Sequence, residues 1–177
     1  MTTTPAGIMR HSHLLKKMVA ACATFQALTD TADATAAESR ISFPALDDTV
    51  ENPIPWPRAV ITEANEFSAT QVGRACWTYQ GSLYVTFEFV VPREEDAESF
   101  ENSYTYMSNK VGAIIAEMIA LSGTGEPVTG ITHLNINAIS LVEGPWYQPV
   151  AEMSGLEAPD VELPFVAWWA TFSVGFF

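Results

Sequence analysis

The alternation of apolar and polar positions is clearest in the last segment of the chain. From Phe165 to Phe177 the even positions are apolar throughout, and the odd positions carry aromatic residues around Thr171 and Ser173. Because successive side chains of a strand point to opposite faces, this segment predicts a strand that buries both faces. A second layer of the same domain can cover one face, whereas covering the other in so short a chain indicates a neighbouring subunit.

The first third of the chain predicts helix followed by an extended connection. Residues 1–7 are expected to form a frayed terminus, and apolar residues then recur every three or four positions from Ile8 to Leu28, as in an amphipathic helix. Residues 30–39 are small and polar and predict either a second short helix or a loop. A short strand at 40–43 and a Pro-rich extended connection at 47–57 are expected next.

Three strands are predicted in the middle of the chain, at residues 57–63, 72–79 and 82–91. Apolar residues alternate with polar ones between Leu83 and Phe89, which favours a half-buried strand. The dipeptide Gln80-Gly81 is typical of a tight turn, so we expect a hairpin that joins the last two of these strands at this point.

The second half predicts one long helix and two strands. Acidic residues after Pro92 favour a helix start, an apolar face recurs from Phe100 to Ile119, and Gly123 ends the helix. A strand is expected at 133–142, where the apolar phase switches at Ile139 as a β-bulge would produce. Residues 143–164 are rich in proline and acids and predict a long loop.

The order of helix, three strands, helix and two strands predicts one domain of the α+β class over residues 1–177. We expect an antiparallel sheet of four to five strands with two helices packed on one face. No internal repeat or second domain is recognised in the sequence.

Composition and charge narrow the class of partner. The chain has 177 residues, 48% hydrophobic and 16% charged, which is typical of one globular domain. Its formal net charge of −13 argues against a nucleic-acid binder, because phosphate recognition requires clustered cations. Neither a membrane-spanning segment nor a signal peptide is predicted. Cys22 and Cys76 are expected to be buried, reduced thiols.

The sequence predicts no catalytic residue, cofactor or metal. His11 and His13 are too few for a metal site and are expected to be exposed at a helix start, and His133 stands alone. Glu88 is expected to be solvated or salt-bridged, with Glu63 as a conceivable carboxylate partner across the sheet. The pair Gly123 and Gly125 predicts a helix end, and the acidic clusters at 47–51, 94–101 and 152–162 predict solvated surface.

Tryptophan is the residue type that points to an interface. Trp56 and Trp146 lie in Pro-rich segments, where an aromatic ring either anchors a partner or packs on its own loop. Core packing is expected for Trp77 and for one member of the Trp168-Trp169 pair. The candidate interface residues are Trp56, Trp146, Tyr147, Trp168, Trp169 and Phe177.

The order of these elements resembles a known family. The helix near the start, the segment Pro57-Arg-Ala-Val-Ile61, the strand end Phe87-Glu-Phe-Val-Val-Pro92, the acid-led central helix and the closing strand Trp169-Ala-Thr-Phe-Ser-Val174 are similar to the tail terminator (tail-completion) proteins of long-tailed bacteriophages and gene transfer agents. The resemblance covers nearly the whole chain from about Leu14. The chain departs from it at residues 30–39 and 143–164.

The resemblance implies a structural virion protein without catalytic residues. A homohexameric ring would cap the last ring of the tail tube, stop its growth, and present the surface that meets the head-tail connector or stopper. DNA would pass through the ring without specific binding. The resemblance also implies assembly in the host cytoplasm, final location in the virion neck and no membrane partner.

Three alternatives remain open at this point. Within the same class, the chain is another neck or tail protein, such as a head-tail stopper or a tail-tube subunit. In a second class it is a small oligomeric enzyme that uses Glu88, His133 or the acidic loops at an interface. In a third it is a peptide- or carbohydrate-binding module that uses Trp56 and Trp146.

Overall fold

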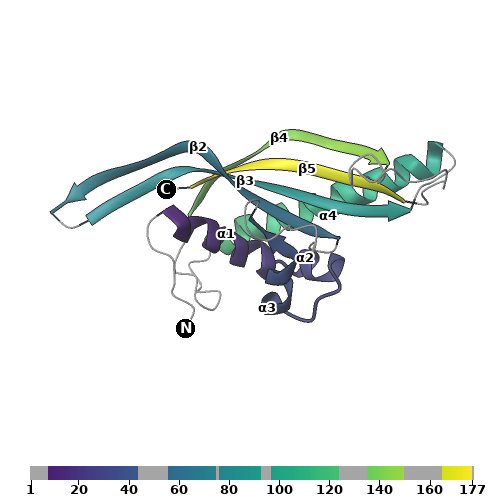
Figure 1. The fold of residues 1–177 in the computed structure, drawn as a ribbon, viewed down its shortest axis with the longest axis horizontal. Coiled ribbons are helices and arrows are strands. Elements are labelled where there is room, and N and C mark those ends of the chain that lie inside the picture. The colour runs from purple at the N-terminus through teal and green to yellow at the C-terminus, as the bar shows by residue number, and fades with distance from the viewer. Residues whose placement is uncertain are drawn as a thin grey trace.

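The described part of the chain forms one five-stranded sheet with helices on one of its faces (Figure 1). The computed structural model describes residues 8–43, 56–74, 76–92, 97–123, 135–149 and 165–176. The helices are α1 (Ile8–Ala21), α2 (Ala23–Leu28), α3 (Ala34–Ala37) and α4 (Ala97–Gly123), with a 3₁₀ turn, η1, at Glu38–Arg40. The strands are β1 (Ile41–Ser42), β2 (Arg58–Gly73), β3 (Cys76–Pro92), β4 (Ile136–Pro149) and β5 (Phe165–Phe176).

The strands lie in the order β1-β2-β3-β5-β4. Strand β1 pairs with β2 in parallel over two residues, and every other pair is antiparallel. Strand β5, although last in the chain, lies between β3 and β4 and therefore has partners on both edges. This placement agrees with the apolar composition of residues 165–176, because a central strand is more shielded than an edge strand.

The core lies between the sheet and the helices. Alternate residues of β3 and β5 point to this layer, where Phe87 contacts the rings of Phe25 and Phe172 with centroids 6.4 and 6.2 Å apart. The largest side chains that are almost completely buried come from both layers: Trp168, Phe25, Phe87, Phe89, Phe176, Leu15, Ile41, Ile61, Ile114 and Met118. Burial of this apolar surface is the main force that holds the helices on the sheet.

The sequence predictions for the helices are confirmed with two changes. The predicted first helix is interrupted at Cys22, whose extended backbone separates α1 from α2. The predicted central helix is α4, and Met107, Val111 and Met118 are buried as expected. Ile119 was expected on the same apolar face, but its side chain is 53% exposed. The predicted alternatives for residues 30–39 resolve to the short helix α3, capped by Asp33, whose side chain accepts a hydrogen bond from the Ala36 amide.

The predicted turn at Gln80-Gly81 is wrong. Both residues lie inside β3, and the chain reverses instead between the paired residues Gly73 and Cys76. Residues 64–71, expected between two strands, belong to one continuous strand, β2, that reaches Gly73. The error has a physical cause: side chains 68–71 are all exposed, so this part of β2 has no buried face and lacks the apolar alternation that identifies a strand.

The predictions around β4 are partly correct. The bulge expected near Ile139 is confirmed as a register shift between Ile136 and Ala138. Residues 143–149, which were expected to lie in a loop, belong to β4, which continues through Gly144 and Pro145 to Pro149. Proline is tolerated there because β4 is an edge strand. The expectations for residues 1–7, 47–55, 124–134 and 150–164 lie outside the described residues.

Candidate interaction surface

One row of residues crosses the face of the sheet that the helices leave open. The register places Arg58 of β2 opposite Glu88 of β3, Glu88 opposite Trp169 of β5, and Trp169 opposite Trp146 of β4. Trp56 joins the row at its start, since the Arg58 guanidinium lies 5.7 Å from the centre of its ring. The structure therefore places two Pro-Trp segments that are far apart in the sequence at the two ends of one row.

The row is held by an ion pair. Arg58 Nε donates to Glu88 Oε2 at 2.6 Å, and the two side chains are only 14% and 15% exposed. Hydrogen bonds between charged groups are the strongest in proteins, and the shielded position reduces competition from water. Glu88 is thus salt-bridged, as expected. Glu63 is not its partner, because Glu63 lies opposite Leu83 and accepts a hydrogen bond from Ser12.

Gly144 fixes the position of Trp146 in this row. Its φ of +83° is a conformation that side chains with a Cβ rarely adopt. A Cβ at this position would lie 2.8 Å from the carbonyl oxygen of Trp169 and 3.0 Å from the amide of Trp146. The β4 backbone therefore approaches β5 closely at a bulge, after which Trp146 is paired with Trp169.

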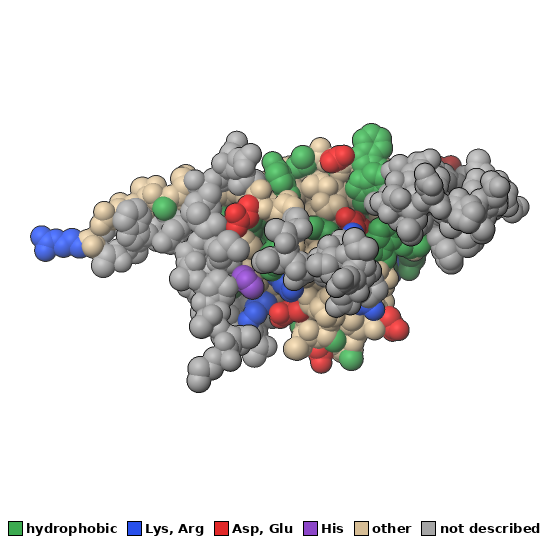
Figure 2. Space-filling view, in the orientation of Figure 1, with side chains coloured by type: hydrophobic (Ala, Val, Ile, Leu, Met, Phe, Trp, Pro, Cys, Tyr) green, Lys and Arg blue, Asp and Glu red, His purple; other side chains and the backbone are tan. Residues whose placement is uncertain are grey.

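Exposed apolar side chains line the β4 edge of the sheet. Leu141, Val142 and Trp146 are 50%, 54% and 52% exposed. Figure 2 shows hydrophobic side chains gathered over β4, on the side of the molecule away from the helices. The charged residue between them, Glu143, is also exposed. An edge strand with exposed apolar residues offers both unpaired backbone groups and apolar surface to another strand.

A hairpin arm projects from the sheet at the other end of the molecule (Figure 1). We use this term for residues 67–81, where β2 and β3 pair with each other from the Phe67–Gly81 pair to the Gly73–Cys76 pair. Strand β5 reaches β3 only as far as Gly81, and β1 reaches β2 only at Ala59 and Val60. The side chains described in the arm, Ser68, Ala69, Thr70, Gln71, Arg74 and Gln80, are all exposed.

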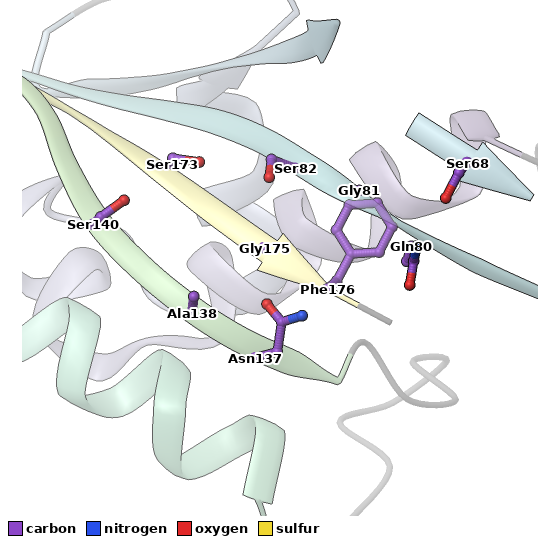
Figure 3. A pocket seen from close by; sticks show the side chains of 10 residues that line it. All are labelled: Ser68, Gln80, Gly81, Ser82, Asn137, Ala138, Ser140, Ser173, Gly175 and Phe176. Atoms are coloured by element: carbon purple, nitrogen blue, oxygen red, sulfur yellow. The ribbon is translucent and has the colours of Figure 1, made fainter. Parts of the chain in front are cut away.

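An open pocket of about 550 Å³ lies where the arm joins the sheet. Figure 3 shows that β2, β3, β4 and β5 all contribute to its lining. The polar groups come from Ser68, Gln80, Ser82, Asn137, Ser140 and Ser173, and Phe176 also contributes to the lining. The described lining residues offer hydrogen-bond donors and acceptors, and none of them carries a charged side chain. Sequence reasoning did not find this pocket, because isolated serines on alternate strand positions read as ordinary solvent-facing residues.

The predicted interface residues fall into different environments. Trp56 and Trp169 are half-buried in the row, and Trp146 is exposed. The prediction of Trp168 as an interface residue is wrong, because its side chain is 1% exposed. Its ring packs on that of Phe89, with the centroids 5.8 Å apart. It is the member of the tandem pair that enters the core. Tyr147, opposite Trp168, packs half-buried against the core. Phe177 and the side chain of Trp77 lie outside the described residues.

The histidines expected to be exposed are half-buried in α1. His11 stacks on Phe176 with ring centroids 4.5 Å apart, and His13 contacts Phe43 at 5.2 Å. The pKa of His13 is lowered mainly by partial burial and, to a smaller extent, by the positive charge of Lys16. Packing against aromatic rings explains both side chains without a metal. Within the described residues no group of three or more metal-ligating side chains occurs.

Cys22 is buried between α1 and α4. Its thiol lies 3.3 Å from the Met18 carbonyl oxygen and 3.7 Å from that of Ile114, and burial raises its pKa to about 12. The beginning of α2 is held by Glu117 of α4, whose carboxylate accepts hydrogen bonds from the amide and the hydroxyl of Thr24. The Cys22 thiol is therefore a structural group, as expected, while the side chain of Cys76 lies outside the described residues.

Compared with known proteins, the chain matches no protein-family model and no curated protein sequence. In the part of the chain that the structure describes, no helix combines the length and apolar character needed to cross a membrane. The acidic clusters at 47–51, 94–96 and 152–162 lie outside the described ranges, and Glu101 at the end of the middle cluster is exposed.

Proposed function

We propose that this protein is a structural subunit of a long-tailed virion or gene transfer agent, and that it acts as the tail terminator. In this role, copies of the chain form a hexameric ring on the end of the tail tube, stop its growth and present the surface that the head-tail connector meets. The subunit assembles in the host cytoplasm and remains in the virion neck.

The hairpin arm is the observation that carries the proposal. Two strands extend beyond the part of β3 that pairs with β5, and the side chains described in this extension are exposed. Ordering such a segment costs conformational entropy that contacts within the subunit do not offset. An arm of this kind is best explained by contacts with another subunit, which is the usual arrangement in a protein built for assembly.

The rest of the fold is consistent with this role. The described elements follow the order of the resemblance, with a first helix, paired strands, a central helix and a closing aromatic strand. One face of the sheet is left open by the helices, and its row of Trp56, Arg58, Glu88, Trp169 and Trp146 combines aromatic rings with a satisfied ion pair. The net charge of −13 suits a ring through which DNA passes without being bound.

Addition of the purified protein to growing tail tubes tests the proposal. A terminator labelled with gold should be found by electron microscopy only at tube ends, and tube length should stop increasing when it is added. Binding along the side of the tube, or incorporation throughout its length, would instead identify a tube subunit. Failure to bind tubes at any concentration would contradict the proposal.

A further inference from the structure

We propose that the hairpin arm of one subunit docks on the β4 edge of the next copy of this chain. This inference rests on the proposed function, because it identifies the contact through which the ring closes. It assigns the arm, residues 67–81, as one half of the contact. The other half is the exposed segment Ser140–Trp146 of β4.

The first argument is the location of unpaired strand edges. Strand β4 ends the order of the sheet, so its outer edge has no strand partner among the described residues. Among the described residues the outer edges of the arm have no strand partner either, because β1 and β5 both stop before it. Backbone amides and carbonyls on such edges can pair with a strand from another molecule, as in recognition by β-augmentation.

The second argument is charge. Arg74 is the only charged residue from Phe67 to Gly81, and Glu143 is the only charged residue from Ile136 to Pro149. Both side chains are exposed. The arm therefore carries a net charge of +1 on a chain whose net charge is −13, and it favours an acidic partner. A second copy of this chain is such a partner, and its β4 presents one acid between apolar residues.

The third argument is the position of the two surfaces on the molecule. The arm leaves the body at one end of the long axis, whereas β4 runs from the middle toward the opposite end (Figure 1). Two different surfaces that meet in this way form a heterologous contact, which closes a ring when the rotation between successive copies closes and otherwise gives an open filament. The proposed hexameric ring is the closed case of this contact.

Matched substitutions on two equally exposed residues test the β4 half. Val142 on β4 is 54% exposed and Ile119 on α4 is 53% exposed. We expect Val142→Lys to weaken self-association at least about tenfold, because lysine on an edge strand blocks strand pairing and here also repels Arg74. Ile119→Lys should leave association unchanged. Masses from sedimentation or light scattering, with and without tail tubes, measure the effect.

Shortening the arm tests the other half. Replacing residues 68–80 by Asn-Gly keeps the Phe67–Gly81 pair and removes only residues beyond β5. We expect this variant to keep its fold, shown by circular dichroism, and to lose the ring. If it does not fold, Arg74→Glu serves in its place. Arg74→Glu and Glu143→Lys should each weaken association, and the double variant should recover it.

Mixing two defective copies gives the sharpest result. The arm-shortened chain retains an intact β4 edge, and Val142→Lys retains an intact arm. The arm of the Val142→Lys chain can therefore still dock on the β4 edge of the arm-shortened chain. The mixture should contain a one-to-one heterodimer, while each variant alone stays monomeric. No heterodimer from two folded variants would overturn the inference.

The outcomes separate the two proposals. A wild-type protein that stays monomeric and ignores tail tubes would overturn the proposed function and this inference together. A ring that forms equally well with the shortened arm or with Val142→Lys would overturn only the inference. If the ring forms equally well with these variants, the β4 edge is available to bind a different protein, such as the connector.

Discussion

Trp146 and Trp169 lie directly opposite each other across β4 and β5, and the residue that permits this register is Gly144. The glycine bends β4 toward the Trp169 carbonyl oxygen just before Trp146. The position of an exposed tryptophan at the sheet edge therefore depends on a backbone conformation two residues earlier.

Gly144→Ala should destabilise the protein by about 1–3 kcal/mol or more, because the backbone has a positive φ and the new Cβ would meet the Trp169 carbonyl oxygen. Urea unfolding followed by tryptophan fluorescence measures this change. Gly112→Ala is the matched control, since nothing lies within 4 Å of its Cβ position in α4. This change should stabilise the protein by about 0.5–1 kcal/mol. A stable Gly144→Ala protein would show that the bulge is not needed.

Phe87→Ala should reduce the free energy of unfolding by about 3–5 kcal/mol, because the ring is 0% exposed and packs between α2 and the sheet. Phe172→Ala should have a smaller effect, since Phe172 is only partly buried. Tyr106→Ala, at a side chain that is 55% exposed, should change stability by less than about 0.5 kcal/mol. Chemical denaturation of the three variants checks this order, and an equal loss in all three would contradict the assigned core.

Glu88→Gln should reduce stability by about 1–3 kcal/mol, because the amide is a weaker partner for the shielded Arg58 guanidinium. Glu101→Gln is the control at an exposed carboxylate on α4 and should change stability by less than about 0.5 kcal/mol. Thermal unfolding compares the two. If Glu88→Gln unfolds at the same temperature as the unchanged protein, the ion pair does not contribute to stability.

The Cys22 thiol should resist alkylation in the folded protein. Its pKa is about 12, against 9.0 for an unperturbed thiol. As the pH rises, the thiol of the unfolded protein therefore loses its proton before the thiol of the folded protein does. The contribution of this group to stability is complete below pH 9 and decreases as the pH rises toward 12. Iodoacetamide at pH 8 with peptide mapping should label Cys22 only after urea is added. Rapid labelling of the native protein would contradict this burial.

The parts of the fold that the sequence predicted are those with a buried face. The helix α4 and the strand from Leu83 to Phe89 have regular apolar periods because each packs against the core. The side chains described in the arm are all exposed, and its strands were divided wrongly at Gln80-Gly81. Residues that lack a partner within their own subunit carry little periodic signal, and this is why the arm could not be found from the pattern.

The interface residues were predicted by type rather than by position. Pro-Trp segments identified Trp56 and Trp146 correctly as residues outside the core, but no local pattern places them on one row, because the row depends on the registers of four strands. For the Trp168-Trp169 pair, the residue type alone does not decide which side chain enters the core. Strand alternation requires that one of Trp168 and Trp169 faces inward, and only the helices on the sheet decide that it is Trp168.

The central position of β5 has a consequence for the order of folding. Thr86 of β3 and Thr171 of β5 share a hydrogen bond at 2.9 Å although they are 85 residues apart in the sequence. The β2–β3 hairpin closes through a local turn and forms early, whereas β5 must join across a long intervening chain, which slows its pairing. Until β5 pairs with β3, one edge of β3 has no partner. At high concentration, newly made chains are therefore most prone to pair wrongly or to exchange strands during this stage of folding.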